Sequence, residues 1–175
     1  LATLASINSF ININKLKKDI FLNFKIPNGR GNITKIKFRN KKFHLIDETY
    51  NSNPLSLKTA IENYDNIVSK NSKKYLVLGD MLELGKHSLK QHKLMGDIVN
   101  KTKIDQVYVL GKYIKETFKK LKPSKKGKIL NDKSDIINLI NKRLVNNDYI
   151  MIKGSNSTGL HETITNLKKR NHYVI

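Results

Sequence analysis

The segment KKYLVLGDMLELGKHSLKQH, residues 73–92, contains the pattern that decides the fold. It begins with an apolar run, YLVL (75–78), passes through a turn between two glycines, and ends in a predicted helix over 88–101. The same order of apolar strand, glycine and helix recurs at VYVLG (107–111) and YIMIKG (149–154). Strands that are apolar on both faces and alternate with amphipathic helices are typical of a covered parallel sheet. We therefore predict an α/β fold with a doubly wound, mostly parallel sheet and helices on both faces.

Two strands joined by the polar turn RNKK (39–42) come first, and from residue 50 onward the chain alternates strand and helix. The predicted strands are ITKIKF (33–38), FHLID (43–47), a short one at 128–130 and the terminal HYVI (172–175). A helix is expected to start at Pro54, with Asn53 as its N-cap, and to run through Val68. Further helices are predicted near 112–121, 134–145 and 159–170.

The N-terminal part has a different pattern. Two short helices are predicted over 1–10 and 14–24, the second from the four-residue spacing of Leu16, Ile20 and Phe24. The Pro/Gly-rich stretch IPNGRGN (26–32) follows and is the best candidate for a domain boundary. The two short helices are therefore expected to belong to a neighbouring domain.

The charge of the chain is strongly positive, with 34 Lys and Arg residues against 14 Asp and Glu, a formal net charge of +20. Such a balance suggests anionic partners, but the lysines are spread along the whole chain. Dense basic runs occur only at 119–128 and 167–170, and no RNP-like motif, Cys/His finger or continuous basic helix is present. A general Lys, Asn and Ile bias on solvated faces explains the charge at least as well, so no nucleic acid partner is expected.

Two absences in the composition limit the class of protein. The sequence has no cysteine, which excludes disulfides and thiolate metal sites and permits a reducing cytoplasm. No apolar run approaches the roughly 18 residues that a membrane-spanning helix needs. We expect a cytoplasmic protein without a membrane span.

The loops after the predicted strands are expected to share one rim, because sites in doubly wound sheets gather at the carboxyl ends of the strands. KGSNSTG (153–159) is the best anion-binding candidate, since Lys153 would add its charge to that of a helix N-terminus. The alternative is an ordinary turn capped by Ser157 or Thr158. DETYNSNP (47–54) is either a functional cluster or a plain N-cap cluster.

The turn from Gly79 to Lys86 approaches the phosphate-binding motif G-x-x-x-x-G-K-[ST] but departs from it. Five residues separate its glycines, and two of these, Asp80 and Glu83, would repel a phosphate. We interpret it as a glycine-hinged turn. The histidines that follow, His87 and His92, lack the spacing of metal ligands and are expected to form hydrogen bonds at the surface or rim, so no metal site is predicted.

Several motifs, in order and spacing, resemble the C-terminal region of the Mur ligases. They are GR (29–30), LIDETYNSNPLSLKTAI (45–61), VLGDMLELGKHSLKQH (77–92) and IKGSNSTGLHETI (152–164). The resemblance implies a Rossmann-like ligase domain over 31–175, preceded by the tail of the central ATPase domain over 1–30. The form of these motifs is most similar to the branch of the family that adds D-alanyl-D-alanine.

The resemblance also implies a reaction and its participants. ATP phosphorylates the terminal carboxylate of UDP-MurNAc-tripeptide, and the amine of D-Ala-D-Ala attacks the acyl phosphate, in peptidoglycan precursor synthesis. ATP and Mg²⁺ would be bound mainly by the central domain, which carries the phosphate-binding loop, and the enzyme would be a monomer. This chain contains no such loop, so we expect it to be a fragment that is inactive alone.

The matching motifs imply roles for individual residues, none of them catalytic. Nucleotide contacts fall on Arg30, as the hinge arginine, on Glu48, where the family usually has an aspartate near the ribose, and on Asn51 and Asn53. Substrate contacts fall on Tyr50, Lys153, Ser155 and Asn156, the last replacing a frequent arginine. The rim loop contributes Asp80, Glu83 and His92.

Other classes of protein remain open at this point. A sister Mur-type ligase or a folylpolyglutamate-synthase-like enzyme would share the architecture and use another amino component. A basic α/β module that binds nucleic acid is the alternative from a different class. Affinity for DNA or RNA that survives above roughly 0.2 M salt would favour that module.

Overall fold

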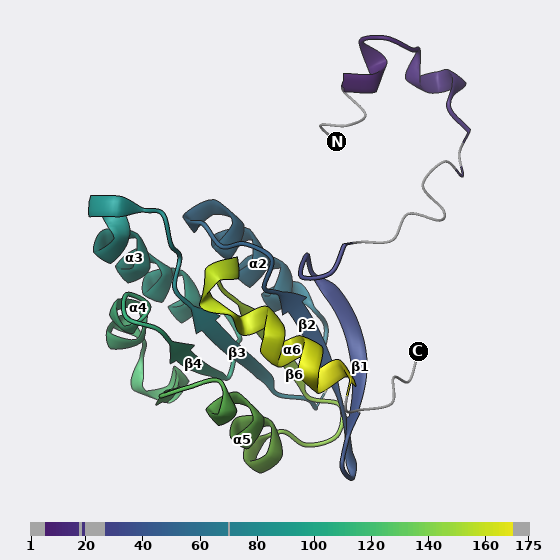
Figure 1. Ribbon diagram of the computed structural model, residues 1–175. Helices are drawn as coiled ribbons and strands as arrows, with labels where there is room; N and C mark the ends of the chain where they lie inside the picture. Colours follow the sequence, from purple (N-terminus) through teal and green to yellow (C-terminus); the bar gives the residue numbers. More distant parts are fainter. Residues whose placement is uncertain (1–5, 18, 20–26, 70, 170–175) are drawn as a thin grey trace.

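The computed structural model describes residues 6–17, 19, 27–69 and 71–169. A six-stranded sheet has the order β1-β2-β6-β3-β4-β5 (Figure 1). β1 and β2 form an antiparallel hairpin, and every other neighbouring pair is parallel. The mostly parallel sheet predicted from the sequence is confirmed. The strands are β1 (Asn32–Phe38), β2 (Lys41–Glu48), β3 (Lys74–Gly79), β4 (Gln106–Leu110), β5 (Lys126–Ile129) and β6 (Tyr149–Lys153).

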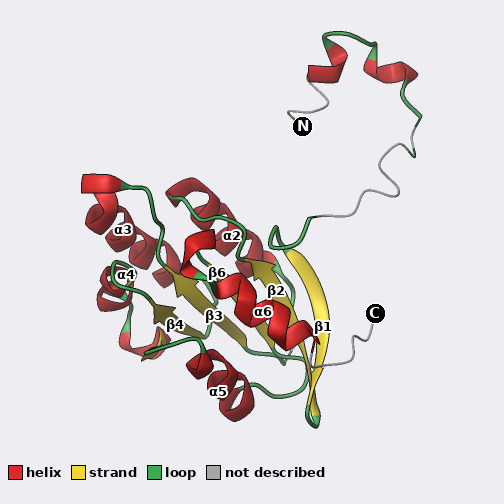
Figure 2. Cartoon of the chain, in the orientation of Figure 1, coloured by secondary structure: helices red, strands yellow, loops and turns green. Residues whose placement is uncertain are grey.

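Helices cover both faces of this sheet (Figure 2). They are α2 (Pro54–Asn66), α3 (Ser88–Asn100), α4 (Lys115–Lys120), α5 (Ser134–Arg143) and α6 (Leu160–Lys169). α5 and α6 contribute to one buried apolar cluster, and α2 and α3 contribute to the other. The sheet is therefore doubly wound, as predicted. Among the described helices, none is long and apolar enough to cross a membrane.

The apolar run of β3 explains why two layers of helix are needed. Tyr75 and Val77 lie in the cluster with α5 and α6, whereas Leu76 and Leu78 lie in the cluster with α2 and α3. All the residues of this strand are buried. Because successive side chains in a strand point to opposite faces, a continuous apolar run requires apolar partners on both sides.

Local sequence signals set the start of α2. The Asn53 side chain accepts a hydrogen bond from Ser56 N, and Ser56 Oγ accepts one from Asn53 N, which completes a capping box before Pro54. The predicted N-cap is confirmed. The end of this helix was predicted too late: it stops at Asn66, Ile67 has an extended backbone, and Val68 is 82% exposed.

The N-terminal predictions are only partly met. Residues 6–8 are helical, and residues 1–5 of the predicted helix over 1–10 lie outside the described residues. The predicted helix over 14–24 is wrong at its start. A short 3-10 helix, η1 (Ile13–Lys15), forms instead, and Leu16 is extended with φ −72° and ψ 138°. Ile20, Phe24 and the predicted strand HYVI (172–175) fall outside the described residues.

The glycines that end β3 and lead out of β6 bring two backbones close together. A Cβ on Gly154 would lie 3.1 Å from Gly79 Cα and 2.8 Å from Leu160 Cδ1. A Cβ on Gly79 would lie 2.7 Å from the same Leu160 atom, and Leu160 is 1% exposed. These two glycines are required by close packing at the rim, whereas a bound ligand is not needed to explain them.

We predict that Gly154→Ala lowers the free energy of unfolding by about 1–3 kcal/mol, because the added methyl group overpacks the contact with Gly79 and Leu160. Urea denaturation of the chain measures this. Gly85→Asn is the control, since a Cβ on Gly85 meets nothing within 4 Å and asparagine tolerates its φ of +50°. Equal losses in both variants would contradict the close-packing argument.

Candidate functional site

A cleft lies beyond the carboxyl ends of β2 and β6. Its volume is about 230 Å³, and it is lined by Gly29, Arg30, Glu48, Tyr50, Asn51, Asn53, Ser56 and Lys153. The set includes every residue for which the motifs implied a nucleotide contact, together with Tyr50 and Lys153. Segments that are far apart in the sequence therefore meet in one place.

Lys153 and Glu48 form the floor of this cleft. They are register partners in the parallel pair of β2 and β6, and Lys153 Nζ lies 3.3 Å from Glu48 Oε2. The same ammonium group donates to the Asn51 carbonyl at 2.8 Å, and Lys153 is only 2% exposed. Burial lowers the pKa of Lys153, and the nearby Glu48 carboxylate partly offsets that shift. Glu48 is thus held by a buried cation while it remains partly open to the cleft.

Arg30 and Tyr50 form the outer wall. The Arg30 guanidinium carbon lies 4.1 Å from the centre of the Tyr50 ring, and both side chains are exposed. Tyr50 N donates to the Gly29 carbonyl at 3.1 Å, and a Cβ on Gly29 would lie 2.8 Å from Tyr50 N. The left-handed Gly29, with φ +78°, therefore lets the chain pass close enough to set Arg30 above the ring.

The acidic and amide residues of DETYNSNP divide between structural and cleft roles. Asp47 is buried, accepts two hydrogen bonds from Thr49, and pairs with Lys168 at 3.2 Å. Asn51 Oδ1 accepts from Ser52 N at 2.7 Å. Asn53 caps α2 and also lines the cleft. The N-cap interpretation therefore holds for Asn53, and the functional interpretation of the residues that line the cleft stays a prediction.

The anion site predicted within 153–159 is not assembled as expected. Lys153 directs its ammonium group to Glu48 and Asn51, and this loop forms a short 3-10 helix, η4 (Asn156–Thr158). Ser155 is buried: its hydroxyl accepts from Leu82 N at 2.9 Å and donates to the Ser52 carbonyl at 3.2 Å. Asn156 is exposed and does not line the cleft. Through these two hydrogen bonds, the Ser155 hydroxyl joins the loop after β3 to the loop after β2.

Asp80 connects the rim loops from its buried position after β3. Its carboxylate accepts from Lys112 N at 2.9 Å and from Ile114 N at 2.7 Å, and its carbonyl accepts from Ser155 N at 3.0 Å. α4 begins at Lys115, later than the predicted 112, just after the two residues whose N–H groups bind Asp80. The acidic residue that excluded a phosphate-binding loop is a structural anchor.

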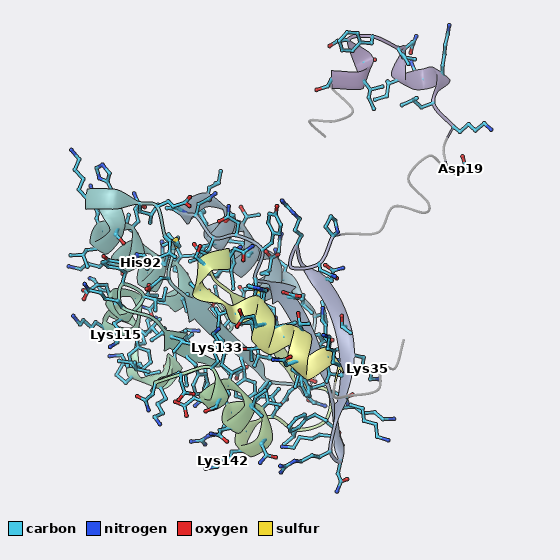
Figure 3. All side chains as sticks on the ribbon, in the orientation of Figure 1. Asp19, Lys35, His92, Lys115, Lys133 and Lys142 are labelled. Carbon is cyan, nitrogen blue, oxygen red and sulfur yellow. The ribbon has the colours of Figure 1, made fainter. Side chains whose placement is uncertain are left out.

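Of the other rim residues, His92 lies beside Asp80, with its Nε2 4.0 Å from Asp80 Oδ1. His92 is fully buried on α3 (Figure 3): its Nε2 accepts from Met81 N at 2.9 Å, so its Nδ1 carries the proton donated to the Ser88 carbonyl at 2.7 Å. His92 thus forms the expected rim hydrogen bonds, away from the surface. Glu83 is exposed and left-handed, with φ +67°. Within the described residues, no group of three or more His, Cys, Asp or Glu side chains could hold a metal ion.

Sequence reasoning missed Ser56 and Gly29 as cleft residues. The spacing of Asn53 and Ser56 fits a capping box with serine at its last position, which could have placed Ser56 beside the cleft. No comparable local signal marks Gly29, because its role depends on the approach of Tyr50.

In doubly wound α/β sheets, ligands bind in the crevice beyond the carboxyl ends of the strands, and this cleft lies there. The family model described as "Mur ligase, glutamate ligase domain" matches residues 30–156. The chain belongs to the Mur ligase family.

Curated relatives and solved structures agree with this membership. The chain is 33% identical over 135 residues to the UDP-N-acetylmuramoyl-tripeptide–D-alanyl-D-alanine ligase of Buchnera aphidicola subsp. Baizongia pistaciae, covering 76% of the chain and 28% of that relative. It is 34% identical over 128 residues to the Bacillus subtilis ligase of the same name, covering 70% of the chain and 27% of that ligase. The crystal structure of MurF ligase from Thermotoga maritima in complex with ADP is similar with a TM-score of 0.66 and 26% identity, over 97% of this chain and 37% of that one. The chain thus spans little more than a quarter of the length of these curated relatives.

We predict that Asp80→Asn lowers the free energy of unfolding by about 1–3 kcal/mol. Asparagine offers one acceptor oxygen, so Lys112 N or Ile114 N would face an amide donor. Glu83→Gln is the matched control in the same loop, and since Glu83 is exposed it should change stability by less than about 0.5 kcal/mol. Urea midpoints of the two variants make the comparison, and an Asp80→Asn variant as stable as the control would show that the anchor is dispensable.

Proposed function

We propose that this chain is the C-terminal part of an ATP-dependent ligase that joins D-Ala-D-Ala to UDP-MurNAc-tripeptide through an acyl phosphate. The main support is the cleft that gathers Arg30, Glu48, Asn51 and Asn53 beside Lys153. The names of the curated relatives and the ADP-bound similar structure favour this reaction among those of the family.

We further propose that residues 1–30 are the tail of a central ATPase domain and that residues 31–175 are the closing domain. The Pro/Gly-rich stretch at 26–32 and the family match from residue 30 support this boundary. The sequence contains no G-x-x-x-x-G-K-[ST] loop, so the γ-phosphate and Mg²⁺ would be bound mainly by the central domain. The enzyme would act as a cytoplasmic monomer, and the chain alone would not turn over.

The cleft residues have chemistry that suits a nucleotide. The exposed Arg30 guanidinium can form charge-assisted hydrogen bonds to a phosphate. Glu48 can accept from a ribose hydroxyl, and Lys153 holds that carboxylate in position through the 3.3 Å ion pair. With Arg30 and Lys153 opposite Glu48, the cleft has an excess of positive charge, which favours an anionic ligand.

Closure of this rim over a neighbouring domain would exclude water from the acyl phosphate. ATP supplies the phosphoryl group that activates the carboxylate. Tyr50, which lines the cleft, would contact the incoming substrate, as would the exposed Asn156. Ser155 would act by holding the loops that carry these residues, through its bonds to Ser52 and Leu82.

Phosphate release from ATP by the protein at its full natural length tests the reaction. We expect release only when UDP-MurNAc-tripeptide and D-Ala-D-Ala are both present, with formation of the UDP-MurNAc-pentapeptide. Release that requires glutamate or another amino acid in place of D-Ala-D-Ala would instead assign a sister ligase. The absence of release with any amino component would refute the proposal.

We predict that Arg30→Ala raises the KM for ATP about ten- to a hundredfold in the full-length protein, because it removes a charge-assisted contact worth about 1.5–3 kcal/mol. Arg39→Ala is the matched control. Arg39 also lies over an aromatic ring, 5.7 Å from the centre of Phe38, but at the far end of β1. Steady-state kinetics with varied ATP measure the difference, and a normal KM in Arg30→Ala would remove Arg30 from the nucleotide site.

A further inference from the structure

A second cleft lies at the opposite edge of the sheet from the candidate nucleotide site. Its volume is about 300 Å³, and it lies between the edge strand β5, the start of β4 and the second half of α5. β5 pairs with β4 irregularly, with a register shift between Val107 and Val109. The strand order places β6 and β3 between this edge and β2, so one small ligand could not occupy both clefts.

The lining of this edge cleft is strongly basic. Lys126, Lys128, Lys142 and Arg143 line it, and Asp135 is its acidic member. The Asp135 carboxylate accepts from Asn131 N at 2.8 Å. The cleft therefore has four cationic residues against one carboxylate.

Three of these cations have no carboxylate partner within the described part of the chain. Lys128, Lys142 and Arg143 are exposed and form none of the ion pairs found there. Lys126 is occupied differently, since its Nζ lies 5.6 Å from the centre of the Phe118 ring and donates to the Lys119 carbonyl. Uncompensated charges around a concave surface concentrate positive potential there.

Tyr108 and Gly127 shape the wall of the cleft. A Cβ on Gly127 would lie 2.6 Å from Tyr108 Cζ, so only glycine lets β5 pass against the ring. The Tyr108 hydroxyl donates to Gln106 Oε1 at 2.8 Å and keeps its acceptor lone pairs. Burial raises the pKa of Tyr108, so the phenol adds no negative charge near neutral pH. The exposed Asn138 amide supplies a neutral donor beside the cations.

We propose that this edge cleft binds an oligophosphate chain, a ligand with several adjacent phosphate groups, through Lys128, Lys142 and Arg143. Several cations around a small concavity suit a ligand with several closely spaced negative charges better than a single phosphate. Tyr108 is only 5% exposed, and the other lining side chains are not aromatic, so the cleft offers no surface on which a base could stack. The cleft would therefore recognise the phosphate groups of a ligand and not a nucleobase. The proposal does not depend on the ligase reaction.

Isothermal titration of the 175-residue chain with inorganic tripolyphosphate, at 50 and 200 mM salt, tests this site. We expect saturable binding that weakens with salt and that is at least tenfold tighter than binding of orthophosphate. The double variant Lys142→Gln/Arg143→Gln should lose at least tenfold in affinity. Figure 3 labels Lys142 on α5, and glutamine is well tolerated in a helix.

The matched control is Lys90→Gln/Lys93→Gln, which removes the same charge from exposed positions on α3, across the sheet. It should bind tripolyphosphate within twofold of the unmodified chain. Equal weakening in both double variants would show a non-specific effect of net charge and overturn the proposal, as would an absence of saturable binding.

Competition distinguishes two sources of the phosphate chain. A single-stranded oligonucleotide that displaces tripolyphosphate, and that loses affinity in the Lys142→Gln/Arg143→Gln variant alone, would identify a nucleic acid backbone as a ligand of the site. Failure of the oligonucleotide to compete would restrict the site to small oligophosphates. Circular dichroism of each variant establishes that the fold is retained.

Discussion

The rim of this domain depends on the buried carboxylate of Asp80. Its two oxygens accept backbone N–H groups from the loop after β4, while its carbonyl accepts Ser155 N from the loop after β6. The next residue, Met81, donates to the buried His92 of α3. Loops from three strands are thus fixed relative to one helix by groups that would each cost free energy if left unpaired.

The candidate nucleotide cleft is connected to this anchor through Ser155. The Ser155 hydroxyl joins Leu82 of the β3 loop to the Ser52 carbonyl, and Ser52 lies between two residues that line the cleft. Lys153, two residues earlier, places a buried cation against Glu48. A charge that is removed from water requires a close partner, so this ion pair restricts where the carboxylate of the cleft can lie.

The large positive charge has a partly structural explanation. Several lysines bind backbone carbonyls at helix ends or in the turns that follow. Lys41 donates to Asn141 in the last turn of α5 and to Leu144 just after it. Lys74 donates to Asp65 near the end of α2, and Lys125 donates to Thr102 after α3. Cations at helix C-termini satisfy free carbonyls and interact favourably with the helix dipole. These lysines support the fold, in contrast to the unpaired cations near β5.

The amino-acid sequence was enough to predict the doubly wound sheet, because continuous apolar strands such as YLVL require helices on both faces. It also determined the N-cap of α2 and the family, through motifs in fixed order. The directions of the polar side chains, in contrast, depend on contacts between distant segments. Lys153 was expected to face the loop over 153–159, but register pairing of β6 with β2 sets it against Glu48.

Asp80 and Glu83 are close in sequence, yet Asp80 is buried and Glu83 is exposed, since only Asp80 meets the N–H groups of a distant loop. Such partners come from segments about 30 to 100 residues away, so no local pattern could identify them.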